Sequence, residues 1–199
     1  SSVVGEGSAY IFSVLQARQP KQLHKLTASG TKNFGCSVGI SGDYAVVGDN
    51  EHGDFRGIVY IFKVSTGEAL QKIIADDSVK GDYFGASVSI DGDRIIVGAY
   101  GNDNLKGAAY IFDTITGQEL RKLTASNGKK GDHFGAKHGV CISGDYAIVG
   151  AEQHQHKAGI AYIFNVKTGK EYKILRGTVI SSGDRLGGSV SIYGNNAIV

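Results

Sequence analysis

Gly107-Ala108-Ala109-Tyr110-Ile111-Phe112 is the stretch of sequence that decides the fold, because the chain repeats its pattern four times. The pattern Gly-x-x-Tyr-Ile-Phe begins at four glycines with spacings of 50, 50 and 52 residues: Gly7, Gly57, Gly107 and Gly159. A second pair keeps the same period: Phe34-Gly35, Phe84-Gly85, Phe134-Gly135 and Leu186-Gly187. A fixed period of this length predicts a repeat architecture, in which each unit buries its apolar faces against its neighbours.

The unit that starts at Phe84 shows the pattern of an antiparallel sheet. Ser87–Ile90 alternates small polar with apolar residues, and a turn at Asp91-Gly92 leads to the short apolar run Arg94–Gly98. These two segments predict a half-buried strand and a strand buried on both faces. Ala108–Phe112 and Glu119–Leu123 predict two further strands. Four-stranded units at this period, without any helical pattern, are typical of the blades of an all-β protein, a β-propeller.

The repeats predict one domain over residues 1–199, with about four blade equivalents. The expected parts are a half blade at 1–30, blades at about 31–80, 81–130 and 131–182, and a half blade at 183–199. The chain begins in the third strand of one blade and stops in the second strand of another, so its half blades are complementary. Three interpretations stay open: closure of a four-bladed ring within one molecule, head-to-tail completion between molecules, and a piece of a longer propeller.

Composition argues against several classes of partner. The net charge is +2, from 21 basic and 19 acidic residues, which gives no electrostatic reason to expect nucleic-acid binding. No apolar run is long enough to predict a membrane span. Cys36 and Cys141 occupy different positions of the repeat, which favours two unlinked buried thiols over a disulfide bridge or an intermolecular bond.

Three stretches resemble the FG-GAP repeat: Phe84–Ile90, Ile96–Ala99 and Gly107–Phe112. Such repeats form the blades of integrin α-subunit heads and of many secreted microbial and algal proteins. The resemblance extends over the whole chain and implies an extracellular or cell-surface β-propeller used for binding or adhesion, not an enzyme. The calcium loop of that family is here a short hairpin such as Asp91-Gly92-Asp93, too short to supply the six to eight or so oxygens that calcium needs, so we predict no metal site of that type.

The loops that follow Gly48, Gly98 and Gly150 are candidate ligand-binding segments on one rim. Their candidate residues are Asp49, Asn50, Asn102, Asp103, Asn104, Glu152 and His154. Oxygen-rich side chains could hold a sugar or a cation there, although Asn, Asp and Gly also favour ordinary turns. His154 and His156 would point the same way on an extended strand and could bind zinc or copper, but no third ligand is evident, so solvated loop residues are expected.

Two further sets of repeated residues have structural explanations. An aspartate stands two residues before the core Phe or Leu at Asp82, Asp132 and Asp184, where a carboxylate that caps a turn is expected in preference to a catalytic one. Tyr10, Tyr60, Tyr110 and Tyr162 are expected to pack within or between blades, the alternative being a belt that stacks on sugars. No phosphate-binding loop or nucleophile elbow is present, so no catalytic residue is predicted.

The sequence therefore predicts a non-catalytic extracellular β-propeller that serves as a structural or adhesive module and assembles with copies of itself through its half blades. The alternative is a carbohydrate-binding propeller that uses the loops after Gly48, Gly98 and Gly150. The expected partner is a protein or a glycan, and neither a cofactor nor a nucleic acid nor a membrane span is expected.

Overall fold

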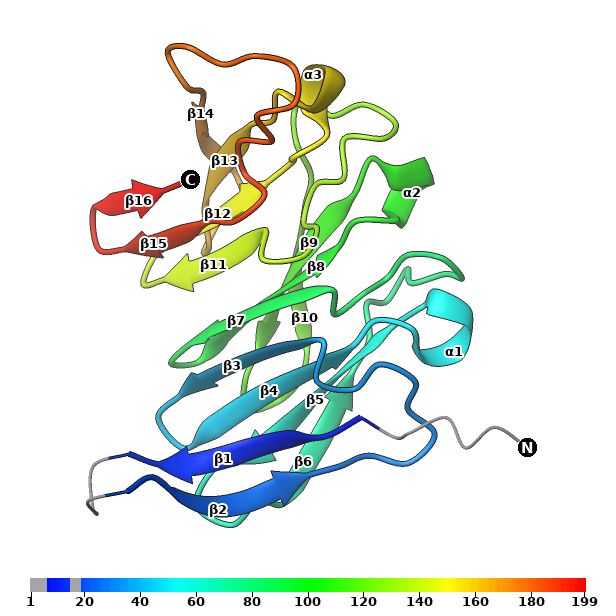
Figure 1. Cartoon of the computed structure of the whole chain (residues 1–199), viewed down its shortest axis with the longest axis vertical. Coiled ribbons are helices and arrows are strands. Elements are labelled where there is room, and N and C mark those ends of the chain that lie inside the picture. Colours follow the sequence, from blue (N-terminus) through cyan, green and yellow to red (C-terminus); the bar gives the residue numbers. More distant parts are fainter. Residues whose placement is uncertain (1–6, 15–18) are drawn as a thin grey trace.

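The computed structural model describes residues 7–14 and 19–199, which form a row of antiparallel sheets (Figure 1). The N-terminal half blade consists of β1 (Ala9–Ser13) and β2 (Lys21–Leu26). Blade 1 consists of β3 (Ser37–Ser41), β4 (Tyr44–Asp49), β5 (Ile58–Lys63) and β6 (Ala69–Ile73). Blade 2 consists of β7 (Ser87–Asp91), β8 (Arg94–Ala99), β9 (Ala108–Asp113) and β10 (Glu119–Leu123). Blade 3 consists of β11 (Val140–Ser143), β12 (Tyr146–Gly150), β13 (Ala161–Asn165) and β14 (Glu171–Leu175). The C-terminal half blade consists of β15 (Ser191–Tyr193) and β16 (Asn196–Ile198).

Within each blade the strands pair in chain order, so the predicted all-β propeller fold with four-stranded blades is confirmed. The turn at Asp91-Gly92 places Asp91 opposite Arg94, and Gly92 has a φ of +55° that suits glycine. β8 is buried along almost its whole length, as its run of β-branched residues predicts. Of the predicted half blade at 1–30, residues 1–6 and 15–18 lie outside the described residues.

Small polar side chains connect the inner strands of successive blades. β3, β7, β11 and β15 lie next to one another in this order without forming one sheet (Figure 1). Ser41 Oγ accepts the backbone N–H of Gly92 at 3.1 Å, and Ser89 Oγ accepts that of Ile142 at 3.2 Å. Ser37 Oγ donates to the carbonyl oxygen of Gly85 at 2.7 Å. These bonds explain why small polar and apolar residues alternate in the first strand of each unit.

A phenylalanine from the start of each complete blade lies in the apolar layer that joins it to the preceding blade. Phe84 packs with Ile61 of blade 1 and with Tyr110 and Phe112 of its own blade. The ring centroids of Phe34, Phe84 and Phe134 lie 5.4–6.0 Å from those of the Tyr and Phe of the third strand in the same blade. Phe34, Phe84 and Phe134 are therefore called the wedges between blades.

A glycine lets the chain approach each wedge closely. Gly57, Gly107 and Gly159 form parallel bridges with Phe84, Phe134 and Leu186 of the following unit. Gly57 has a φ of +86°, and a Cβ added there would collide with the carbonyl oxygen of Phe84. The first glycine of Gly-x-x-Tyr-Ile-Phe is therefore required by the junction between units rather than by its own strand.

The loops between the second and third strands contain short helical turns, which the sequence had indicated only as irregular loops. These are α1 (His52–Phe55), α2 (Asn102–Leu105) and α3 (His154–Lys157), and they lie along one side of the row (Figure 1). Their last residues have left-handed backbone, with φ of +64° at Phe55, +66° at Leu105 and +67° at Lys157. The expectation that His154 and His156 share a face of an extended strand is wrong, because both lie in α3.

The left-handed turns bind the next blade through their carbonyl oxygens. The segment just before each Phe-Gly or Leu-Gly pair, here called the leading loop, supplies the donors. Tyr83 N–H donates to Phe55 O at 2.8 Å, and His133 N–H donates to Leu105 O at 3.0 Å. Non-glycine residues rarely adopt this backbone because it crowds the Cβ atom. The backbone hydrogen bonds to the next blade compensate for that strain and hold the two units together.

The two half blades do not complete each other within the described part of the chain. β1 pairs with β2 and β15 pairs with β16, and the two sheets lie at opposite ends of the row (Figure 1). These strands therefore do not pair to close a ring within one molecule, which was one of the three interpretations left open by the sequence.

We expect Phe84→Ala to lower the free energy of unfolding by about 3–5 kcal/mol, because the wedge is fully buried. Phe84→Leu should cost less than about 1.5 kcal/mol, since a Leu preserves most of the volume and stands naturally at position 186. Ile115→Ala, at an exposed turn, should change stability by no more than about 0.5 kcal/mol. Urea titration followed by circular dichroism measures all three, and equal losses for the Ala and Leu variants at Phe84 would contradict the wedge.

Candidate interaction surfaces

Carboxylates cap the leading loops, as the repeated aspartates predict. Asp82 Oδ2 accepts the N–H of Val79 at 3.0 Å, and Asp132 Oδ2 accepts that of Lys129 at 2.8 Å. Each of these two oxygens also contacts a side chain in the helical turn of its own blade. Asn102 Nδ2 donates to Asp82 Oδ2 at 3.1 Å, and His154 Nδ1 lies 2.7 Å from Asp132 Oδ2, with both pairs buried.

The leading loop of blade 1 is also capped by a carboxylate, but this carboxylate comes from a different position of the repeat. This loop is shorter, and Lys32 stands where the other blades have Asp82 and Asp132. Asp49, which replaces the alanine of the other repeats, accepts the N–H groups of Lys32 at 3.3 Å and Asn33 at 2.9 Å. Asp49 is fully buried, so its carboxylate is part of the loop's internal bonding.

The seven candidate ligand-binding residues do not form one site. Asp49, Asn50, Asn102 and His154 are buried and bonded or packed inside the protein. The finding corrects the expectation that His154 is a solvated loop residue. Asp103 and Asn104 are exposed on α2, and Glu152 is half-buried at the next junction. In the described residues no three His, Cys, Asp or Glu side chains gather to hold a metal ion.

The repeated tyrosines of the complete blades are core residues. Tyr60, Tyr110 and Tyr162 are fully buried, and the hydroxyl of Tyr110 donates to Asp77 Oδ1 at 2.8 Å. The hydroxyl of Tyr162 donates to Asn127 Oδ1 at 2.7 Å. Burial raises the pKa of all three phenols. The packing role is therefore confirmed for these three.

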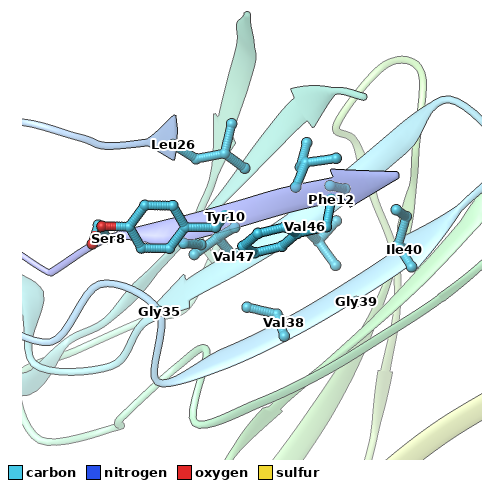
Figure 2. Close-up of a pocket in the computed structure, with 13 residues that line it drawn as sticks. Ser8, Tyr10, Phe12, Leu26, Gly35, Val38, Gly39, Ile40, Val46 and Val47 are labelled. Carbon is cyan, nitrogen blue, oxygen red and sulfur yellow. Dashed lines mark hydrogen bonds between the residues drawn. The ribbon is translucent and has the colours of Figure 1, made fainter. Parts of the chain in front are cut away.

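Tyr10 differs from its three equivalents because it lies at the open edge of the N-terminal half blade. Tyr10 is 48 % exposed and Phe12 is 51 % exposed, whereas Tyr60 and Phe62 are buried. Val38 and Ile40 on β3 are also largely exposed. Together these four residues form what we call the β1 surface, around a cavity of about 510 Å³ between β1, β3 and β4. Figure 2 shows Tyr10 and Phe12 on β1 beside the strand that carries Val38 and Ile40.

The opposite end of the row presents a second apolar surface. Tyr193 on β15 is 85 % exposed and Ile198 on β16 is 71 % exposed. Leu186, the fourth wedge, is only partly buried. In the complete blades a wedge meets a Tyr and a Phe, but the fourth set is divided, with Leu186 at one end of the described chain and Tyr10 and Phe12 at the other.

A row of rings crosses the blade junctions on the side of the helical turns. The centroid of Phe55 lies 5.2 Å from that of Tyr83, Tyr83 stacks on Tyr100 at 4.7 Å, and Tyr100 lies 5.5 Å from His133. Beside its last members is a depression of about 250 Å³, lined by Tyr100, His133, Ala136, Lys137 and Glu152. Of these, only Glu152 is a candidate ligand-binding residue from the sequence. The available signal was the variation at position 133, where the equivalent residues are Asn33, Tyr83 and Arg185.

Two further features bear on chemistry and location. Cys36 and Cys141 are unlinked and half-buried, and burial raises the pKa of the Cys36 thiol above its ordinary value. Among the helices of the described residues, none is long and apolar enough to cross a membrane.

We expect Asp49→Ala to destabilise the protein by about 2–3 kcal/mol, although Ala is the residue of the other repeats at this position. The reason is that the backbone donors of Lys32 and Asn33 would lose their acceptor. Asp132→Ala should cost a similar amount because it leaves His154 unpaired. Asp76→Ala, at an exposed position, serves as the matched control and should stay within about 0.5 kcal/mol. Thermal unfolding at fixed pH measures the differences. A stability of Asp49→Ala equal to that of the wild type would show that the carboxylate does not stabilise the leading loop.

The buried phenols should make the fold sensitive to alkali. Burial raises the pKa of Tyr100 to about 12 and raises those of Tyr110 and Tyr162 further. An unfolded tyrosine ionises near pH 10 or so, so above that pH the unfolded state loses protons that the folded state keeps. Stability should be constant at neutral pH and should fall as the pH rises above about 10. Phenolate absorbance should show part of the tyrosines ionising only on unfolding, and a single reversible titration of all ten would contradict this.

Comparison with known proteins agrees with the architecture. The model of the FG-GAP repeat family matches residues 21–62, 68–112 and 118–164. No curated protein matches the chain. The crystal structure of the computationally designed Ika4 protein is similar with a TM-score of 0.52 and 17% identity, over 83% of this chain and 81% of the designed one. That of the designed Ika8 protein has a TM-score of 0.53 and 17% identity, over 80% of this chain and 41% of that one, so this chain spans less than half of Ika8. At this identity the likeness shows the fold alone. Because the matched segments make up more than half of the sequence, the chain belongs to the FG-GAP repeat family.

Proposed function

We propose that this chain is a non-enzymatic extracellular interaction module that associates with further copies of itself through its half blades. The observation that supports this most directly is the β1 surface, where Tyr10, Phe12, Val38 and Ile40 stay exposed although their equivalents in blades 2 and 3 are buried. An apolar surface beside an unpaired strand edge favours the addition of further strands. The extracellular placement rests on the family, whose repeats are typical of extracellular proteins.

The repeat itself indicates what fits the β1 surface. In blade 2, the first strand, β7, carries Val88 and Ile90, which pack on blade 1. In the N-terminal half blade only the third and fourth strands are present, as β1 and β2. The C-terminal half blade supplies strands of the first and second kind, because Ser189–Val199 repeats the pattern of Ser37–Val47. A second copy of β15 and β16 therefore matches the β1 surface in type.

The register of such a pairing follows from blade 1. There β4 pairs with β5 so that Ala45 lies opposite Phe62 and Val46 opposite Ile61. The equivalent register places Ala197 opposite Phe12 and Ile198 opposite Ile11. Asn196 then lies opposite Ser13.

The same docking would complete the divided wedge. It would place Leu186 of one copy beside Tyr10 and Phe12 of the next, as Phe134 lies beside Tyr162 and Phe164 in blade 3. Removing both rings and the wedge from water favours association by roughly 25 cal/mol per Å² of apolar surface. Because the two surfaces of this head-to-tail contact differ, the contact generates either a closed ring of copies or an open filament.

Carbohydrate binding by the loops after Gly48, Gly98 and Gly150 remains a second candidate function. Of the residues expected to act there, Asp103 and Asn104 are exposed and Glu152 is half-buried. The row of rings beside these loops is the observation that favours it.

We expect the 199-residue chain to form concentration-dependent oligomers, and we expect Tyr10→Lys combined with Phe12→Lys to reduce them to monomers by placing charges on the β1 surface. Ile115→Lys changes an exposed apolar residue at the turn between β9 and β10 of blade 2 and serves as the control that should still assemble. Light scattering after size-exclusion chromatography measures the mass over a range of concentrations. A wild-type chain that stays monomeric throughout would refute self-association.

A cysteine pair tests the register. In blade 2, Arg94 and Asp113, the equivalents of Asn196 and Ser13, are in contact at 3.2 Å. Ser13→Cys with Asn196→Cys, in a background of Cys36→Ala and Cys141→Ser, should give disulfide-linked multimers on oxidation. Gln22→Cys with Asn196→Cys, which moves the thiol to the other strand of the half blade, should link poorly. A linked band at monomer mass would instead indicate closure within one chain.

A further inference from the structure

The depression beside the row of rings combines residues from two blades. Tyr100 precedes α2 of blade 2, and Glu152 precedes α3 of blade 3. His133 lies in the leading loop of blade 3, and Lys137 belongs to the two-residue insertion of that repeat. The cavity of about 250 Å³ that they line with Ala136 is here called the rim depression. Neither half blade contributes to it.

The rim depression lies where the repeats differ in sequence, next to a wedge and a glycine that scarcely change. The residue before the wedge is Asn33, Tyr83, His133 or Arg185. At the first junction Asn33 Nδ2 donates to Asn50 Oδ1 at 2.9 Å, and at the second Tyr83 stacks on Tyr100 with an interplanar angle of 15°. At the third, His133 and Glu152 both line a cavity. The side chains that contact each other at the first two junctions are thus replaced at the third by two polar side chains that line a cavity.

The backbone of His133 shows that the side chain at this position can be exchanged for glycine. Its φ is +57°, in the left-handed region that favours glycine, and its N–H donates to Leu105 O at 3.0 Å. A glycine would make the same backbone bond with less strain. The backbone bond explains the conformation but not the imidazole. Tyr83 and Arg185 have the same left-handed backbone, with φ of +55° at each, so the conformation belongs to the junction, and it is the side chains lining the rim depression that point to a ligand.

The groups around the rim depression offer donors and acceptors on one side of an aromatic surface. Burial lowers the pKa of His133 below its ordinary value, and this outweighs the carboxylates of Glu152 and Asp132, which raise it. The imidazole is then neutral near pH 7, with one donor and one acceptor nitrogen. Glu152 supplies an acceptor pair, and the exposed Lys137 supplies a donor. Tyr100, half-buried and stacked on Tyr83, supplies the apolar surface.

We propose that the rim depression binds one pyranose ring of a carbohydrate. Every hydroxyl group of a sugar both donates and accepts, which matches Glu152, neutral His133 and Lys137, while the carbon face of the ring matches Tyr100. The cavity is smaller than the roughly 300–1,000 Å³ of sites for drug-sized molecules, which fits a single ring with the rest of a chain in solvent. This goes beyond self-association and gives carbohydrate binding a location that shares only Glu152 with the loop residues expected from the sequence.

The test uses methyl glycosides of glucose, galactose, mannose, fucose and N-acetylglucosamine as probes, followed by saturation-transfer NMR and titration calorimetry. We expect at least one to bind the wild-type chain. Glu152→Gln should weaken that binding at least tenfold. Glu68→Gln removes an exposed carboxylate from a distant hairpin and should leave it unchanged. Tyr10→Lys with Phe12→Lys should also leave it unchanged, which separates this site from self-association.

His133→Gly provides a readout that a purely structural role would not give. It should abolish glycoside binding while the melting temperature stays the same or rises, because glycine relieves the left-handed strain. The proposal is overturned if no glycoside binds the wild-type chain, or if binding survives both Glu152→Gln and His133→Gly. Should His133→Gly fail to fold, Glu152→Gln against Glu68→Gln decides the question alone.

Discussion

The close passage of the Phe84 backbone over Gly57 is the constraint on which the rest of the molecule depends. Because glycine has no Cβ, the first residue of each Gly-x-x-Tyr-Ile-Phe segment can bridge to the wedge of the next unit. That contact brings the phenylalanine ring against the Tyr and Phe of its own blade and the apolar face of the blade before. The spacing between Gly57 and Phe84 therefore sets how one blade meets the next, and repetition of this junction produces the row of blades.

The leading loops show that the repeats preserve an interaction rather than a residue. A buried carboxylate must accept the backbone N–H groups of each loop, because an unpaired buried donor is costly. Blades 2 and 3 place the carboxylate inside the loop, at Asp82 and Asp132. Blade 1 has a shorter loop and takes the carboxylate from the end of β4, at Asp49. The exchange explains why a residue that the sequence indicated as a ligand is instead fully buried.

The fold could be predicted from the sequence because its period, its turn residues and its wedges are local patterns that repeat. The strands Arg94–Ala99 and Ala108–Asp113 follow directly from runs of β-branched and aromatic residues. The binding surfaces could not, for two physical reasons. The left-handed turns at α1–α3 contain residues such as Leu105 and Lys157 that have no intrinsic preference for this backbone, and the carbonyl bonds to the next blade, which the sequence does not reveal, help to hold them there. Tyr10 stands in the same motif as the buried tyrosines Tyr60 and Tyr110, and it is exposed because the strands that would cover it are missing from its half blade. The motif alone therefore could not reveal its exposure.

Function in this molecule is expected where the repeat is broken rather than where it is kept. The aromatic residues that recur in the complete blades hold units together, and their side chains are buried in those contacts. Two kinds of departure leave side chains free: the ends of the row, where a core set is divided between Leu186 and the Tyr10–Phe12 pair, and the junction of blades 2 and 3, where His133 and Glu152 replace closed contacts. The first kind has the apolar character and open strand edge that suit a protein partner, and the second has the polar, neutral character that suits a sugar. Because they lie on different parts of the molecule and share no residue, one chain can be joined to its neighbours and still keep its rim available to a ligand.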